Sequence, residues 1–208
     1  MLHTKAVERT TLELLTEICA ISQLYQFALI GGTNLALRFG HRKSIDLDFF
    51  TPVEFNESQL EQIIFHHFKD AQLSHSDRQT RQYIIHDIKV EFIGFRYPLI
   101  NDFEKLEGVR LFSLQDTIAA KLNAVLGRGS KKDFFDIYEL LNNYPLTELI
   151  KQFKIKFNQK DVFPLLKSLN YFEDAEQEPD PVSLNNTSWK QVKDKIDTEL
   201  REYLKDVV

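Results

Sequence analysis

The sequence predicts an α+β protein, with a mixed β-sheet in the N-terminal half and only helices in the C-terminal half. Short apolar or alternating runs, typical of strands, lie between residues 27 and 95. From Ser113 onward, apolar residues recur at helical spacing instead. No internal repeat interrupts this layout. A chain of 208 residues suits one domain, or a core domain with a small appendage.

The N-terminal half is expected to alternate helices with strands. Leu12, Leu15 and Cys19 share one helical face, which predicts a helix over residues 4–22. The other expected elements are strands at 27–30 and 45–50, helices at 34–39 and 57–68, and two or three strands within 71–95. Gly40 is expected to end the second helix, and His86-Asp87 suits a hairpin turn.

The C-terminal half is expected to begin with a capped helix. Ser113 and Asp116 resemble a capping box, and Ile118, Leu122 and Val125 form the buried stripe that follows. Residues 127–130 break this helix. Further helices are expected at residues 132–142, 147–157, 161–169 and 188–204. The acidic, proline-containing stretch 174–186 is expected to be an exposed connection.

Composition excludes several classes of protein. The chain is 43% hydrophobic and 27% charged, which excludes a wholly disordered or collagen-like protein. Its single cysteine, Cys19, excludes a disulfide framework and a thiolate metal cluster. No apolar run approaches the roughly 18 residues that span a bilayer, and residues 1–11 lack a signal peptide's apolar stretch. We therefore expect a cytoplasmic protein with no membrane partner. A net charge of −5 argues against general nucleic-acid binding but leaves a local basic face open.

The first candidate for chemistry is Gly31-Gly32-Thr33, between an expected strand and an expected helix. Glycines let a ligand approach the backbone, and the free N–H groups of a helix start favour an anion. A triphosphate fits such a turn, and Thr33 adds a hydroxyl group. The same residues also suit a plain strand-to-helix turn, so this motif alone does not distinguish a phosphate-binding site from a structural turn.

Three acids are candidates for a metal site. Asp46 and Asp48 stand two residues apart in an expected strand, so both side chains point to one face. Two such carboxylates repel unless a cation lies between them, and Mg²⁺ prefers oxygen ligands. Glu91, in a later strand, is costly among large apolar neighbours unless it is paired or metal-bound. An exposed strand face explains Glu91 equally well, whereas for Asp46 and Asp48 this explanation is weakened by Phe50, which shares their face, and by the nearby Arg42 and Lys43.

Basic and acidic residues also gather after residue 120. Lys121 and Arg128 are seven residues apart and share one helical face, which is suited to phosphates. On the next helix, Asp133 is expected at the edge of the buried stripe, and Asp136 further toward solvent. Taken singly, Asp133 is explained as a first-turn acid and Lys121 as a solvated lysine.

The order of these motifs resembles the nucleotidyltransferase superfamily with a polymerase-β-like core. Residues 28–37 and 40–50, which contain the glycine pair and the Asp-x-Asp motif, are similar to AbiEii/AbiGii-type nucleotidyltransferase toxins. Residues 121–137 are similar to that family's second block, and the resemblance covers roughly residues 21–141. It implies a nucleotidyltransferase core at 1–110 with flanking helices, and a helical region at 111–208 that completes the active-site cleft.

The resemblance implies an enzyme that moves a nucleoside monophosphate from an NTP to an acceptor. The acceptor would be the 3′ end of tRNA or a protein, and the enzyme would be a toxin with a separately encoded antitoxin. Mg²⁺ or Mn²⁺ would be held by Asp46 and Asp48, with Glu91 as a third ligand or as a base. The nucleotide would be bound by Gly31, Gly32, Thr33, Arg42, Ser44, Lys121 and Arg128. Asp133 would position Lys121 or assist catalysis, in preference to Asp136.

Three other functions fit parts of the pattern. A small-molecule nucleotidyltransferase would use the same first block of motifs. A non-catalytic module would keep the core only to bind a nucleotide or a partner. A metal-dependent phosphoesterase fits less well, because no histidine lies near the acids in the sequence.

Overall fold

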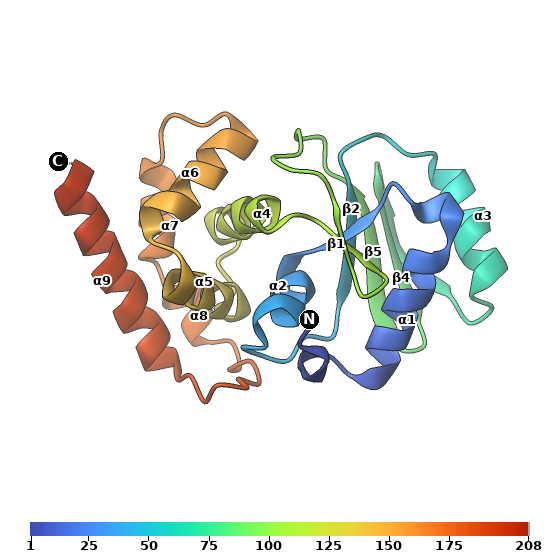
Figure 1. The fold of residues 1–208 in the computed structure, drawn as a ribbon, viewed down its shortest axis with the longest axis horizontal. Helices are drawn as coiled ribbons and strands as arrows, with labels where there is room; N and C mark the ends of the chain where they lie inside the picture. Colours follow the sequence, from blue (N-terminus) through green and yellow to red (C-terminus); the bar gives the residue numbers. More distant parts are fainter. Residues whose placement is uncertain (208) are drawn as a thin grey trace.

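A mixed β-sheet fills one half of the computed structural model, which describes residues 1–207, and helices fill the other (Figure 1). The strands are β1 (Ala28–Ile30), β2 (Leu47–Thr51), β3 (Gln72–Asp77), β4 (Thr80–Ile85), β5 (Ile88–Gly94), β6 (Glu104–Leu106) and β7 (Val109–Leu111). Their order across the seven-stranded sheet is β3-β4-β5-β2-β1-β7-β6. The α+β class expected from the sequence is confirmed.

Three helices pack around the sheet and six follow it among the described residues. The first three are α1 (Arg9–Ala20), α2 (Gly31–Phe39) and α3 (Glu57–His67). The helical half consists of α4 (Leu114–Gly127), α5 (Lys131–Asn143), α6 (Leu146–Phe157), α7 (Phe163–Leu169), α8 (Glu173–Glu176) and α9 (Trp189–Val207). None of the helices within residues 1–207 combines the length and apolar character needed to cross a membrane.

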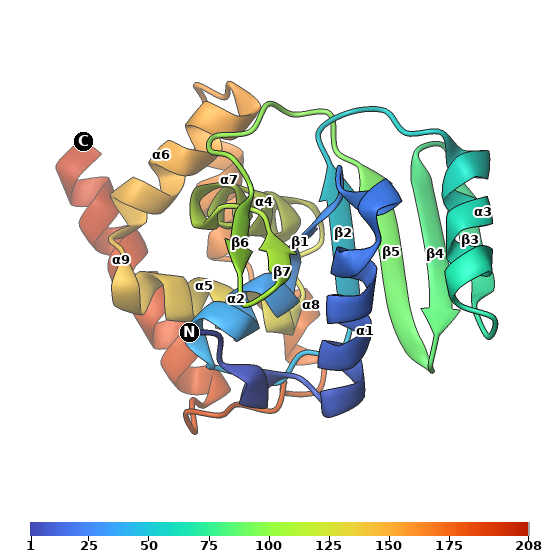
Figure 2. The ribbon, with the colours of Figure 1, turned by 45° about the vertical axis from the view of Figure 1, so that its right-hand side comes forward.

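The two faces of the sheet have different roles. One face is covered by α1 and α3 (Figure 2). Leu14, Ile64, Phe49 and Phe92 belong to the buried apolar cluster on this side. The other face looks toward α2 and α4, which lie between the sheet and the remaining helices (Figure 1). Alternation along β2 and β5 directs apolar side chains to the first face and acids to the second.

The helical half has an apolar core of its own. Leu122, Phe134, Ile137 and Leu149 are fully buried in a second cluster that joins α4, α5, α6, α7 and α9. The expected capping box begins this half: the Ser113 hydroxyl accepts from the backbone N–H of Asp116 and donates to its carboxylate. Helix α4 therefore starts at a fixed place directly after the last strand.

Several elements differ from the sequence-based expectation. The first helix is shorter, because residues 4–6 form a separate 3-10 turn and Val7 is extended. Helix α2 begins at Gly31, so the glycine pair forms its first turn rather than a preceding loop. The short strands β6 and β7 were not expected. The stretch 174–186 contains the end of α8 and pairs with residues 41–43, so only part of it is a free connection.

Candidate active site

A cavity of about 360 Å³ lies between the second face of the sheet and α4. From the sheet side it is lined by the start of α2 and by β2 and β5, including Gly31, Gly32, Asp46, Asp48 and Glu91. From the helical side it is lined by Lys121 of α4, by Arg128 directly after the end of α4, and by Lys132 of α5. The structure thus brings the glycine pair, the three acids and the basic residues together around one cavity.

Gly31 sits directly against Asp48. Its φ of +75° lies in the left-handed region that favours glycine. A Cβ atom at this position would stand 2.9 Å from the Asp48 carboxylate oxygen Oδ2. In the sheet, Asp48 pairs with Ile30, the residue immediately before Gly31. The first turn of α2 and the acid are therefore fixed to each other by the backbone.

Gly31→Ala is expected to lower activity strongly, because the new methyl group displaces the Asp48 carboxylate. Misplacement of a reacting group by about 1 Å costs on the order of 10²-fold in rate. The matched control is Gly108→Ala, because Gly108 has a similar φ of +85° and no other atom lies within 4 Å of the place its new methyl group would occupy. Backbone strain should lower the free energy of unfolding of both variants by about 1 kcal/mol. Urea denaturation measures this loss. Equal activity losses in the two would contradict the role of the contact with Asp48.

The acids form the sheet side of the cavity. Asp48 on β2 pairs in register with Glu91 on the parallel strand β5, and Asp46 lies one residue before β2. Burial, together with the negative charges of Glu91 and Asp46, raises the pKa of Asp48 to about 6. Bringing like charges together in this way is unfavourable without a cation.

The donor set fits a hard divalent cation. Carboxylate oxygens are the ligands that Mg²⁺ prefers, and Mg²⁺ usually completes its shell with water and substrate phosphates. Among the side chains that the structure describes, those of residues 1–205, no three from acids, histidines or cysteines converge closely enough to hold a metal ion alone. Asp46 and Asp48 therefore fit a site whose remaining ligands come from the substrate and solvent. Glu91 is also engaged with Lys89, at 3.6 Å between Nζ and Oε2.

Cations line the opposite side of the cavity. Lys121 contacts Asp133 and Asp136 at 2.8 Å each, and these two acids outweigh the cost of burial and raise the pKa of Lys121. Arg128 shares Asp133 with Lys121, while its side chain remains 63% exposed. The Nζ of Lys132 stands 3.6 Å from Asp46. Lysine has three N–H donors, so Lys121 keeps one for a phosphate oxygen.

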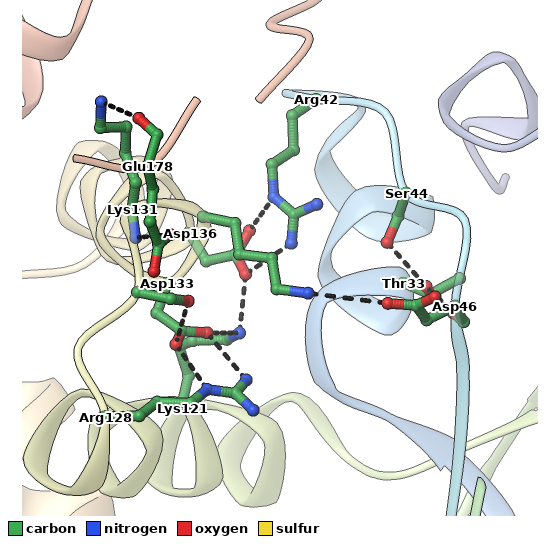
Figure 3. Close-up of polar contacts among 12 residues, drawn as sticks. Thr33, Arg42, Ser44, Asp46, Lys121, Arg128, Lys131, Asp133, Asp136 and Glu178 are labelled. Atoms are coloured by element: carbon green, nitrogen blue, oxygen red, sulfur yellow. Dashed lines mark hydrogen bonds and ion pairs between the residues drawn. The ribbon is translucent and has the colours of Figure 1, made fainter. Parts of the chain in front are cut away.

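Asp136 is the centre of a buried ionic cluster with Arg42 and Lys121 (Figure 3), and His41 also contacts it. Its carboxylate accepts from Arg42 Nε at 2.7 Å and Nη2 at 2.9 Å, and contacts His41 Nε2 at 2.7 Å. Arg42 and Lys121 hold the pKa of Asp136 well below its usual range, although burial opposes this. The expectation that Asp136 points toward solvent is wrong. The loop at 41–43 covers Asp136. The spacing of apolar residues along α5 could not predict this, because it carries no information about segments from elsewhere in the chain.

Three expected nucleotide ligands lie behind the cavity wall. The Thr33 hydroxyl contacts the Ser44 hydroxyl at 2.8 Å and donates to the backbone carbonyl of Asp46. Arg42 is buried against Asp136, and a methyl group on Gly32 would collide with its guanidinium group. Because α2 begins at Gly31, its third residue faces the loop before β2 and not the cavity. None of these three residues lines the cavity, and their contacts join the loop before β2 to α2 and α5.

A segment near residue 183 packs on the outer side of the loop at 41–43. Residues 41–43 exchange backbone hydrogen bonds with residues 182–184, and Arg42 pairs with Ser183 as an isolated bridge. Glu178 accepts from the backbone N–H of Lys131 at 2.8 Å, at the start of α5. These contacts were not expected from the sequence, because short backbone bridges leave no periodic pattern.

The chain matches a known protein family over almost its whole length. Residues 13–207 match the model of the nucleotidyl transferase AbiEii toxin family of type IV toxin–antitoxin systems. This chain belongs to the AbiEii family. It is also 32% identical over 200 residues to the uncharacterized protein aq_aa25 of Aquifex aeolicus, an alignment that covers 93% of this chain and 96% of that one.

Solved structures share the fold of this AbiEii-family protein. MenT4, the nucleotidyltransferase toxin Rv2826c from Mycobacterium tuberculosis, has a TM-score of 0.60 at 15% identity, covering 92% of this chain and 82% of MenT4. JHP933 from Helicobacter pylori has a TM-score of 0.57 at 18% identity, covering 96% of this chain and 94% of JHP933. Family membership makes the chain a nucleotidyltransferase, and the family match extends beyond residues 21–141 into the helical half.

Proposed function

We propose that this protein is a Mg²⁺-dependent toxin that transfers a nucleoside monophosphate from an NTP to an acceptor hydroxyl. One observation carries the proposal: the carboxylates of Asp46 and Asp48 share a cavity with the first turn of α2 and with the cations of α4. Acids on one side and cations on the other suit a metal-bound triphosphate.

The reaction is a displacement at the α-phosphorus. The acceptor oxygen forms a bond to that phosphorus, the bond to the β-phosphate oxygen breaks, and pyrophosphate leaves. Gly31 and Gly32 would bind phosphate oxygens through the free N–H groups of the first turn of α2. Lys121 and Arg128 would stabilise the charge on the leaving pyrophosphate, and Glu91 would accept the proton of the acceptor hydroxyl.

Asp46 and Asp48 would hold the metal ion, with Asp133 fixing the position of Lys121. When bound, Mg²⁺ supplies charge neutralisation to the triphosphate. The acceptor is the 3′ end of a tRNA or a protein, in the cytoplasm where NTPs are available. Membership of a toxin–antitoxin family supports an antitoxin as a further partner.

The test is incubation with each α-labelled NTP, Mg²⁺, total tRNA and cell protein, followed by locating the label. Wild-type protein is expected to label one acceptor class, and Asp46→Asn is expected to lose at least about 10²-fold in labelling. Asp194→Asn, an exposed site on α9, is the matched control and should label as wild type. Label confined to a small molecule would favour the antibiotic-type alternative, and equal labelling by Asp46→Asn would refute the metal site.

A further inference from the structure

The cavity has an apolar end that the proposed chemistry does not use. Phe50 follows Asp48 by two residues on β2, and Ile93 follows Glu91 by two residues on β5. Because β2 and β5 are parallel, both apolar side chains extend the cavity in the same direction, away from Asp46. The cavity is therefore charged along one part and apolar at the carboxyl ends of these two strands.

Two aromatic rings form the wall of this apolar end. Phe50 and Phe95 pack at 5.3 Å between ring centroids, with planes inclined by 50°. Both side chains are only partly buried and both line the cavity, together with Ile30 and Ala120. Partly uncovered aromatic faces next to a phosphate-binding region suit the stacking of a flat heterocycle.

The wall is supported from behind by a buried ion pair. Lys156 contacts Asp116 at 2.6 Å, and both side chains are completely buried. The Lys156 ammonium group also lies 5.5 Å from the centroid of Phe95 and donates to the backbone carbonyl of Pro98 at 3.0 Å. This pair takes no part in the proposed catalysis. It fixes the residues that present Phe95 to the cavity.

Asn123 is the one uncharged polar side chain among the described residues that line the cavity. It lies on α4 between Ala120 and Ala124, and its amide makes no hydrogen bond with any described residue. The small neighbours leave room beside it. An amide carries two N–H donors and one acceptor, which matches the edge of a nucleobase.

We propose that the aromatic end of the cavity binds the nucleobase of the incoming NTP, and that Asn123 selects the base. The inference deepens the proposed function and rests on it. Phe50 and Phe95 supply a stacking surface that accepts any base, whereas the Asn123 amide supplies the hydrogen bonds that differ between bases. The triphosphate then extends from this end toward Gly31, Gly32 and the acids.

The experiment measures binding of the four NTPs and of inorganic tripolyphosphate by titration calorimetry with Mg²⁺ and without any acceptor. Wild-type protein should discriminate between the best and worst base by about tenfold or more. Asn123→Leu should bring the four dissociation constants within about threefold of one another. Phe95→Leu, which keeps Lys156 covered, should weaken all four NTPs by about tenfold. Neither variant should change the affinity for tripolyphosphate.

Asn185→Leu is the matched control, because Asn185 is exposed and does not line the cavity. It should reproduce the wild-type base preference. Retained preference in Asn123→Leu, or no preference in the wild type, would overturn the inference while leaving the transferase intact. An effect of Asn123→Leu on turnover but not on NTP binding would assign this end to the acceptor, and so would also overturn it. Failure of the wild type to bind any NTP or tripolyphosphate would instead overturn the proposed function.

Discussion

Asp48→Asn is expected to abolish nucleotidyl transfer and, at the same time, to stabilise the metal-free protein at neutral pH. The carboxylate lies against Gly31, opposite Glu91 and beside Asp46. Loss of a metal ligand at this position removes several kcal/mol of transition-state stabilisation, which corresponds to about 10³-fold or more in rate. The amide keeps the shape of the side chain, so the fold is retained.

The gain in stability follows from the pKa of Asp48. Burial raises this pKa to about 6 in the folded protein, with Glu91 and Asp46 adding to the effect, whereas an unfolded aspartate titrates near 4. Ionisation therefore costs the folded state more than the unfolded state. The stabilising effect of the protonated form is complete below about pH 4 and is lost as the pH rises through about 6. Above that range, the Asp48→Asn protein is expected to be more stable than the wild type, whose Asp48 is ionised, by about 1–3 kcal/mol.

The measurement is urea unfolding of both proteins at pH 4 and pH 7.5 in the presence of a chelator. The free energy of unfolding should be nearly the same for the two proteins at pH 4 and larger for the variant at pH 7.5. Added Mg²⁺ should then stabilise the wild type more than Asp48→Asn. A variant that is less stable at pH 7.5 would contradict the repulsion among Asp48, Glu91 and Asp46.

Local patterns in the sequence predict most of the fold. The hairpin at His86-Asp87 is confirmed, since both residues have positive φ values, as a tight two-residue turn requires. Gly40 ends α2 in the left-handed conformation, as expected. The strands β6 and β7 escaped prediction because each has only three residues, too few for a period to appear.

Spacing along one element also predicts part of the site. Asp46 and Asp48 both line the cavity, as their alternate spacing predicts, although β2 begins only at Leu47. Lys121 and Arg128 meet at Asp133, as a spacing of two helical turns predicts, although α4 ends at Gly127. Two partners of Asp136, His41 and Arg42, come from a loop 95 and 94 residues away, and no local pattern encodes these contacts. The nearest signal in the sequence is Arg42, close before the Asp-x-Asp motif, for which the resemblance implies a contact with the nucleotide.

The buried cluster around Asp136 leads to the second large prediction, for Asp136→Asn. The substitution removes the one negative charge that contacts His41, Arg42 and Lys121 together, and leaves the Arg42 guanidinium group buried without a counter-charge. Breaking a buried pair in this way costs about 3–5 kcal/mol. For a chain of this size, the melting temperature should fall by roughly 6–20 °C. Because Arg42 lies directly against Gly32, activity should fall even at temperatures where the variant stays folded.

Asp133→Asn provides the matched comparison, since Asp133 is equally buried and shares Lys121 with Asp136. Its other cation, Arg128, is largely exposed and can turn to water, so Asp133→Asn should cost less than half as much stability. The double variant Arg42→Met with Asp136→Leu should recover part of the loss, because it removes both charges together. Equal costs for the two single variants, measured by thermal unfolding at pH 7, would show that the contact with Arg42 does not hold α2 in place.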